Sequence, residues 1–256
     1  MGLRAYLLEK SFVYRLLQAP FAADKVKPLL AGNDLSRVGR VLDVGCGPGT
    51  NTALFAHAEY LGIDINPLYI ERARRRYGRS FVVADAASYQ AAAGESYDLI
   101  LMNSFLHHLD AEAVDRVLSH LGTLLSPGGN IHILDLVLPP DRSISRWLAL
   151  RDRGGFPRPL EEWREMFARH FHILAFEPYG LKALGTTLWN MVYCKGERLK
   201  STGVKPTGTA LARIAMRFEA QPSTMSPGIA EESARIWKPV PGPRSRHGTR
   251  DRIPTR

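Results

Sequence analysis

The stretch VLDVGCGPGT at residues 41–50 runs from an apolar segment into a bend rich in glycine. Its three glycines, Gly45, Gly47 and Gly49, allow a sharp turn and let the backbone approach a ligand without a Cβ in the way. Residues 51–58, NTALFAHA, follow at once and are predicted to form a helix whose unpaired N–H groups face the same crevice. This order of strand, glycine bend and helix predicts a nucleotide-binding turn.

Short apolar runs alternate with segments of helical period through residues 41–195, which is typical of a mainly parallel α/β sheet. Asn66 and Pro67 are expected to open one helix that Gly78 closes, and Asp110 is expected to cap another. The predicted strands cover residues 40–44, 60–63, 80–83, 97–102 and 130–136.

Two further apolar runs close this part of the chain, at residues 172–180 and 188–196. Because they follow one another directly, we expect a hairpin, which gives the sheet an antiparallel edge strand. The predicted fold is therefore α/β, a Rossmann-like three-layer sandwich with a mainly parallel seven-stranded sheet and an antiparallel edge strand.

The composition changes at both ends of this α/β region. Residues 1–37 are predicted to form an amphipathic helical lid, with peripheral contact to a membrane surface as the alternative. Residues 38–199 are the expected ligand-binding domain. Residues 200–256, rich in Pro, Gly, Ser, Thr and Arg, are the expected basic and disordered tail. The apolar stripe of the lid consists of Leu3, Leu7, Phe12, Val13, Leu16 and Leu17.

Charge and cysteine content restrict the function further. The net charge is +9, but residues 201–256 hold ten Lys and Arg against four Asp and Glu, so most of the excess lies in the tail. A nucleic-acid partner for the folded part is therefore disfavoured. Cys46 and Cys194 are the only cysteines, which allows neither a disulfide framework nor a four-cysteine metal site, and we expect no metal. We find no secretory signal and no run long enough to span a bilayer, and expect a cytoplasmic protein.

The details of the bend distinguish between cofactors. A dinucleotide fingerprint reads G-x-G-x-x-G, whereas the glycines here run G-x-G-x-G and Thr50 takes the last position. Asp43 precedes the bend, and its carboxylate would repel a pyrophosphate but attract a sulfonium cation. The chain here resembles the class I S-adenosylmethionine-dependent methyltransferases of small molecules, and the resemblance spans roughly residues 38–195.

The resemblance implies a set of cofactor-binding residues at the strand ends. In that family the acid at the position of Asp64 accepts hydrogen bonds from both ribose hydroxyls, and the acid at the position of Asp85 accepts one from the adenine amino group. The backbone amide of Ala86 would serve an adenine ring nitrogen, and the backbone near Asn103 would hold the methionine part. The full expected set is Asp43, Gly45, Cys46, Gly47, Gly49, Asp64, Ile65, Asp85, Ala86 and Asn103.

Catalysis of methyl transfer needs mainly alignment of the acceptor with the methyl carbon. His107 and His108 follow the fourth predicted strand, where an acceptor would approach, and either could remove a proton from a hydroxyl or an ammonium group. Packing under the next helix is an equally good interpretation of this pair. The N-P-P-Y type of sequence found in methyltransferases of nucleic-acid bases and glutamine is replaced here by NSFL.

The sequence therefore predicts an S-adenosylmethionine-dependent methyltransferase that acts on an O, N or C atom of a small-molecule or lipid-like acceptor. Two alternatives remain: an RNA methyltransferase that uses the basic tail, and an NAD(P)-dependent oxidoreductase. The acceptor and the oligomeric state are not specified by the residues.

Overall fold

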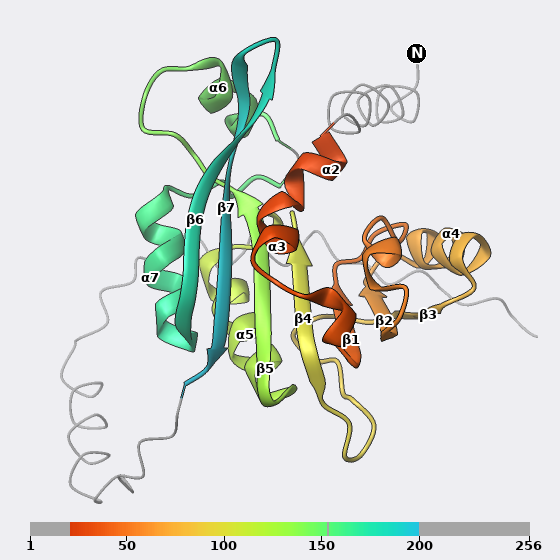
Figure 1. Ribbon diagram of the computed structural model, residues 1–256. Coiled ribbons are helices and arrows are strands. Elements are labelled where there is room, and N and C mark those ends of the chain that lie inside the picture. The colour runs from red at the N-terminus through yellow and green to blue at the C-terminus, as the bar shows by residue number, and fades with distance from the viewer. Residues whose placement is uncertain (1–20, 153, 200–256) are drawn as a thin grey trace, which may run out of the picture. The chain divides into compact units, whose positions relative to one another are not determined.

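The computed structural model describes residues 21–152 and 154–199, which belong to the first of two compact units of the chain, residues 1–200. Seven strands form a single sheet in the order β3-β2-β1-β4-β5-β7-β6 (Figure 1). The strands are β1 (Arg40–Val44), β2 (Glu59–Asp64), β3 (Ser80–Val83), β4 (Tyr97–Asn103), β5 (Leu125–Leu136), β6 (Phe171–Ala183) and β7 (Thr186–Arg198).

The described helices connect and cover these strands. They are α2 (Ala22–Lys25), α3 (Lys27–Ala31), α4 (Pro67–Tyr77), α5 (Ala111–Thr123), α6 (Ile144–Leu150) and α7 (Leu160–His170), with short 3-10 turns η2 (Leu35–Arg37), η3 (Thr52–Phe55) and η4 (Leu106–His108). Strands β1 to β5 run parallel, and β7 pairs antiparallel with both β5 and the edge strand β6. The predicted α/β fold, mainly parallel with antiparallel pairing at one edge, is confirmed.

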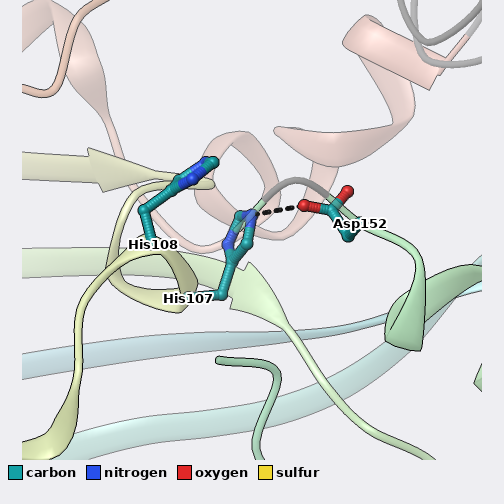
Figure 2. A group of neighbouring side chains, drawn as sticks. All are labelled: His107, His108 and Asp152. Carbon is teal, nitrogen blue, oxygen red and sulfur yellow. Dashed lines mark ion pairs between the residues drawn. The ribbon is translucent and has the colours of Figure 1, made fainter. Parts of the chain in front are cut away.

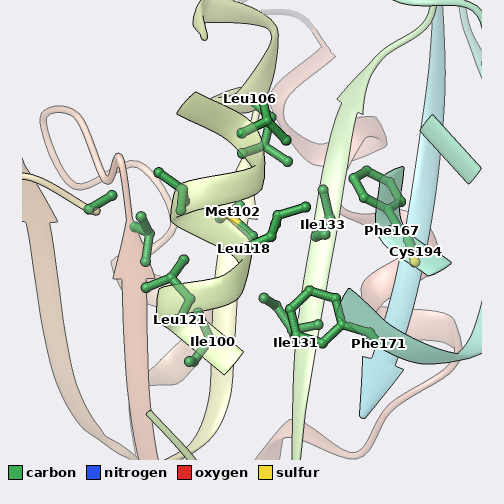
Figure 3. Close-up of a cluster of buried hydrophobic side chains, with 14 of the residues drawn as sticks. Ile100, Met102, Leu106, Leu118, Leu121, Ile131, Ile133, Phe167, Phe171 and Cys194 are labelled. Atoms are coloured by element: carbon green, nitrogen blue, oxygen red, sulfur yellow. The ribbon is translucent and has the colours of Figure 1, made fainter. Parts of the chain in front are cut away.

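Each face of the sheet carries its own apolar core. On one face α5 and α7 pack against β4, β5 and β7, and Figure 3 shows Leu118, Ile133 and Phe167 meeting there. On the other face Leu29 of α3 and Ile70 of α4 belong to a second buried cluster with residues of β1, β2 and β4. Two covered faces make the three predicted layers and explain why the central parallel strands are mainly apolar.

The predicted helix caps are confirmed. The side chain of Asn66 accepts a hydrogen bond from the N–H of Leu68, and Gly78 ends α4 with a φ of 58°. Asp110 accepts from the N–H of Ala113 at the start of α5. These caps satisfy main-chain groups that a helix end leaves unpaired, which is why short polar residues and glycine mark the boundaries.

The predicted helix over residues 51–58 is wrong in extent, because only the 3-10 turn η3 forms there. At the end of this segment the guanidinium of Arg79 donates hydrogen bonds to the carbonyl oxygens of Phe55, Ala56 and Ala58. Since β2 begins at Glu59 and Phe55 is anchored in the core, the chain has no room for a longer helix.

The sequence SPGG at residues 126–129, which precedes the predicted fifth strand, lies within β5. β5 begins at Leu125, five residues before the predicted start, and its pairing with β4 shifts register between Tyr97 and Leu99. Gly128 adopts a φ of 81° within this irregular stretch, where residues 126–129 are accommodated as a bulge. Among the described residues no helix is both long and apolar enough to cross a membrane.

The expected lid and tail lie largely outside the described residues. Residues 1–20, which carry the predicted amphipathic stripe, and residues 200–256 are not described, so the lid and the disordered tail stay predictions. Of the predicted lid, residues 22–25, 27–31 and 35–37 form the short helices α2, α3 and η2.

Candidate functional site

The loops that follow β1, β2, β3 and β4 meet at one edge of the sheet. Val44 of β1 lies opposite both Ile63 of β2 and Met102 of β4, and Asp64 lies opposite Val83 of β3. Because parallel strands share their carboxyl edge, the predicted site residues after these strands are brought to one side of the molecule. This is where such folds bind their ligands.

The three glycines of the bend differ in the atoms that surround them. All three have positive φ angles, between 55° and 83°. A Cβ on Gly45 would lie 2.5 Å from the ring of Phe105, and one on Gly49 would lie 2.8 Å from the ring of Tyr77. A Cβ on Gly47 would meet no protein atom within 4 Å. The space beside Gly47 is thus a cradle that a side chain would fill, and it suits a ligand in contact with the main chain.

Asp64 ties the glycine bend to the end of β2. One carboxylate oxygen accepts the N–H of Gly47 at 2.9 Å, and the other accepts the N–H of Asn66 at 2.8 Å. A carboxylate has further lone pairs, so Asp64 can hold the bend and still accept from a ligand hydroxyl. Ile65, next along the chain, exposes 72% of its side chain at this edge, an apolar surface that a bound nucleoside could cover.

The sequence predicts that Asp43 faces a cationic ligand, but the structure places it in the interior. It is fully buried and accepts hydrogen bonds from the hydroxyl of Tyr60 at 2.7 Å and from the side-chain amide of Asn51. Burial raises the pKa of Asp43 to about 7, against the effect of these hydrogen bonds and with a contribution from Asp64. No part of Asp43 is accessible in this structure, and its contact with a ligand stays a prediction.

Asn103 continues the same polar chain to the end of β4. Its side-chain amide donates to Asn51 at 3.0 Å, and Asn51 in turn donates to Asp43. The residue after it, Ser104, has a φ of 56°, which is uncommon for a side chain other than glycine. This backbone conformation turns the chain sharply at the strand end.

The remaining expected cofactor residues lie at the same edge with unequal exposure. Asp85 is exposed, and its side chain accepts the N–H of Ala87 at 2.9 Å. The side chain of Ala86 is buried in the core on the α5 face. Cys46 is also buried, and burial raises the pKa of its thiol, so only its main chain is suited to ligand contact.

His107 in η4 is buried between two carboxylates. Its Nδ1 lies 2.5 Å from Oδ1 of Asp135, and its Nε2 lies 3.1 Å from Oδ1 of Asp152. Burial by itself lowers the pKa of His107, but the charges and hydrogen bonds of the two carboxylates raise it to about 9. The two carboxylates therefore favour the protonated form of the ring. An imidazolium has no lone pair with which to accept a proton, so this geometry does not fit the expected role of His107 as a base.

His108 lies beside His107 but points elsewhere. It is exposed, and the centroids of the two rings are 4.3 Å apart (Figure 2). One ligand atom from each of His107, His108 and Asp152 falls within 4.8 Å of the others, a spacing at which three groups can hold a metal ion. Oδ1 of Asp152 lies 3.1 Å from Nε2 of His107, and we interpret these side chains as an ion-pair cluster. The catalytic role of His108 stays a prediction.

Lys25 is a component of the site that the sequence did not indicate. Its ammonium group lies 3.1 Å from the hydroxyl of Ser104, and burial lowers its pKa while Asp152 and Asp135 raise it. Lys25, Ser104, His107, Asp152 and Trp189 line one small pocket together with Leu136 and Met191. The carboxyl edge of the sheet thus combines a main-chain cradle with buried groups of both charges.

The sequence contained a signal for only one of the three new site residues. Asp135 interrupts an apolar strand near its carboxyl end, the position that Asp64 also takes in its own strand. Lys25 lies in a segment of mixed charge, and Asp152 lies in a loop rich in Arg and Gly. Polar residues in such segments are common, so neither could be distinguished from a solvent-exposed side chain without the fold.

Comparison with solved structures shows the same fold in known methyltransferases. The N-methyltransferase NodS from Bradyrhizobium japonicum WM9 matches with a TM-score of 0.56 at 20% identity, over 71% of this chain and 98% of that chain. NodS in complex with S-adenosyl-L-homocysteine matches with a TM-score of 0.55 at 18% identity, over 72% and 88%. At this level of identity the likeness concerns the fold.

Sequence comparison goes further than the fold. A family model described as a methyltransferase domain matches residues 41–129. The trans-aconitate 2-methyltransferase of Methylobacterium nodulans is 30% identical over 246 residues, which cover 86% of this chain and 92% of the relative. The enzyme of the same name from Escherichia fergusonii is 36% identical over 151 residues, 54% of this chain and 58% of the relative.

These relationships decide between the cofactors that the glycine bend left open. The nicotinamide alternative is wrong, because the matching family model and the curated relatives are methyltransferases. Identity that extends along nearly the whole of a curated relative shows the family, and the chain belongs to the class I methyltransferases that use S-adenosylmethionine as methyl donor.

Proposed function

We propose that this methyltransferase transfers its methyl group to a carboxylate oxygen of a small organic acid and releases a methyl ester. The relatives named trans-aconitate 2-methyltransferase support an acid as acceptor. The observation that carries the proposal lies in the site itself: the buried histidine beside the pocket, His107, lies between the carboxylates of Asp135 and Asp152, which favour its protonated form.

A protonated His107 favours an acceptor that needs no base. A hydroxyl or an ammonium group must lose a proton before or during attack on the methyl carbon, whereas a carboxylic acid is already ionised at neutral pH. A carboxylate oxygen therefore attacks as it stands, and the protein has only to align it. The same site would serve an alcohol or amine poorly, because His107 cannot take up a proton.

The charges around the pocket are compatible with an anionic acceptor. Asp135 is satisfied by the main-chain N–H groups of Phe105, Leu106 and Leu136 in addition to His107, so its charge is well compensated where it is buried. Lys25 brings an ammonium group to the same pocket, at the hydroxyl of Ser104. We propose that the ammonium group of Lys25 and the hydroxyl of Ser104 bind and orient the reacting carboxylate.

We further propose that residues 38–199 form the cofactor-binding domain and that the strand-end loops hold the cofactor. S-adenosylmethionine supplies the methyl group on a positively charged sulfur, which is a good leaving group. The main chain of Gly45, Cys46, Gly47 and Gly49 would line its amino-acid part together with Asn103, and Asp64, Ile65, Asp85 and Ala86 would bind its nucleoside. Asp43 would act from beneath as a support, because it is linked to Asn103 through Asn51.

The test compares acceptors that share a skeleton and differ in the reacting group. The full-length protein is incubated with labelled S-adenosylmethionine and a carboxylic acid, the corresponding alcohol or the corresponding primary amine. We expect label in a methyl ester, which alkali hydrolyses to labelled methanol, and none in an ether or a methylamine. Transfer to the alcohol or the amine but to no acid in the panel would refute the proposal. Gly47→Val serves as the control without cofactor binding.

A further inference from the structure

A large cavity adjoins the small pocket at Lys25 and has no role in the argument so far. It measures about 840 Å³ and lies between α6, the start of α7, residues 137–141 and the β6–β7 hairpin. Figure 1 shows α6 beside the projecting end of this hairpin, and α6 is in contact with β7. The volume is in the range of binding sites for small organic molecules.

The walls of the cavity are mainly apolar and rigid. Its apolar lining includes four prolines, Pro139, Pro140, Pro159 and Pro178, and the side chains of Leu138, Leu160 and Met191. Prolines and core side chains change little in conformation, so the site is largely formed before a ligand enters. Such walls favour an apolar ligand, because covering them removes apolar surface from water.

The charged lining gives no net attraction for an anion. Arg146 and Lys182 line the cavity, but so do Asp141 and Glu161. The guanidinium of Arg146 already donates to the carbonyl oxygen of Pro139. A ligand with three carboxylates would meet two cationic side chains here and would also face the carboxylates of Asp141 and Glu161, so at least one of its charges would have no cationic partner.

Met191 connects the cavity with the proposed reaction site. It lines both the large cavity and the small pocket that contains Lys25, Ser104 and His107. Leu136 lines the small pocket and its neighbour Val137 lines the cavity. The apolar space of the cavity thus lies next to the small pocket, with the buried side chain of Met191 between them.

We infer that the acceptor is a monocarboxylic acid with an extended apolar body, and that this body binds in the cavity while the carboxylate lies at Lys25 and Ser104. The inference rests on the proposed carboxylate methylation and makes it more specific. It distinguishes this chain from its relatives, whose named substrate, aconitate, is a tricarboxylic acid. An acceptor with one carboxylate and an apolar body needs one cationic contact and one apolar wall. The small pocket offers the first and the large cavity offers the second.

The first experiment measures kcat/KM for straight-chain monocarboxylic acids from butanoate to decanoate, with trans-aconitate alongside. Each methylene that enters the cavity is expected to raise kcat/KM roughly fourfold, the equivalent of about 0.8 kcal/mol per buried methylene. Decanoate would then exceed trans-aconitate by a wide margin. Equal values along the series, or a preference for trans-aconitate, would overturn the inference and leave carboxylate methylation itself intact.

The second experiment fills the cavity with a matched pair of variants. Thr187 lines the cavity, whereas its neighbour Thr186 is exposed and does not. Thr187→Trp is expected to lower kcat/KM for decanoate at least tenfold, and Thr186→Trp to leave it unchanged. Pro178→Trp, at an exposed position of the cavity wall, provides a second blocking variant, and unchanged affinity for S-adenosylhomocysteine shows that each variant is folded.

A direct measurement of binding distinguishes a failure of this inference from a failure of the proposed function. Calorimetry with decanoate and S-adenosylhomocysteine needs no turnover, so it tests the cavity even if no acid is methylated. Binding to the parent protein and to Thr186→Trp, with loss in Thr187→Trp and Pro178→Trp, supports the cavity as the site. Equal affinity in all four proteins, or no binding to any of them, would refute it.

Discussion

Oδ1 of Asp135 lies 2.5 Å from Nδ1 of His107, and this contact joins the end of β5 to the segment that follows β4. The other oxygen of Asp135 accepts the main-chain N–H groups of Phe105 and Leu106. Asp135 therefore fixes both the imidazolium ring and the backbone that carries it. On the opposite side of the ring Asp152 supplies a second carboxylate, so the positive charge of His107 is balanced where water is excluded.

We expect His107→Ala to destabilise the protein by about 3–5 kcal/mol, because it leaves Asp135 and Asp152 buried without their shared cation. His108→Ala is expected to change stability by less than about 0.5 kcal/mol, since His108 is exposed. Urea unfolding of both variants measures the difference. Similar stability in the two variants would show that the cluster contributes little.

The same pair of variants tests cofactor binding and catalysis separately. Neither histidine belongs to the glycine bend, so both variants that remain folded are expected to bind S-adenosylhomocysteine with the parent affinity. At least one of them is expected to slow methyl transfer. If both transfer methyl groups at the parent rate, the histidines have a structural role alone.

Stability should fall as the pH rises above neutrality. The pKa of folded His107, about 9, lies above that of an unfolded histidine, so its charge stabilises the fold fully below about pH 6.5 and progressively less toward pH 9. Asp43, with a pKa of about 7, produces a decline of the same sign but at lower pH, between about 4 and 7. Lys25, whose pKa is lowered by burial, contributes a slope of opposite sign below its unfolded pKa, so the contribution of His107 is obtained by comparing the parent with a His107 variant between pH 7.5 and 8.5.

The measurement is the free energy of unfolding in urea at several pH values within that window, for the parent and for His107→Gln. The parent is expected to lose stability with rising pH, and the variant, which cannot titrate at this position, is expected to show a flatter profile. Parallel profiles would mean that the pKa of His107 is not raised in the folded protein.

Gly47→Val is expected to abolish binding of S-adenosylhomocysteine, because the branched side chain would fill the cradle beside the glycine bend. Gly78→Val is a matched control: its φ of 58° is close to the 55° of Gly47, and a Cβ there also meets no protein atom. Both variants carry the same backbone strain, but only Gly47 faces the proposed ligand. Calorimetry distinguishes them, and unchanged affinity in Gly47→Val would refute the placement of the cofactor.

Gly154→Ala is expected to disturb the ion-pair cluster from outside. A Cβ on Gly154 would overlap both the ring and the main chain of His107, so either the ring or the loop that carries Asp152 must move. We expect a loss of stability of about 1–3 kcal/mol, as for other overpacked sites. Gly122→Ala is the control, since it lies in α5, where alanine is favoured and the nearest atom, in Phe171, is 3.4 Å away. Equal stability of the two variants would contradict the packing described here.

Much of the fold could be predicted because it depends on short-range signals. The strands 40–44 and 80–83 were predicted with their observed limits, and Asn66, Gly78 and Asp110 cap helices as expected. Each of these features is decided by residues within a few positions of one another, through hydrophobic period, capping hydrogen bonds or tolerance of positive φ. The helix expected at residues 51–58 failed for the opposite reason, because β2, which pairs with β1, begins at Glu59 and Phe55 is anchored in the core.

The parallel α/β sheet, the glycine bend and the acids that follow its strands can be predicted from the residues alone, since they are patterns along the chain. Which of those acids is buried depends on the assembled fold, because Asp43 is fully buried whereas Asp64 is partly exposed. The fold also brings Asp135 to His107 across 28 residues and Lys25 to Ser104 across 79. Such pairs produce no periodic pattern in the sequence. A buried charge needs a compensating partner beside it, and that partner comes into place only when the sheet and its crossovers are assembled.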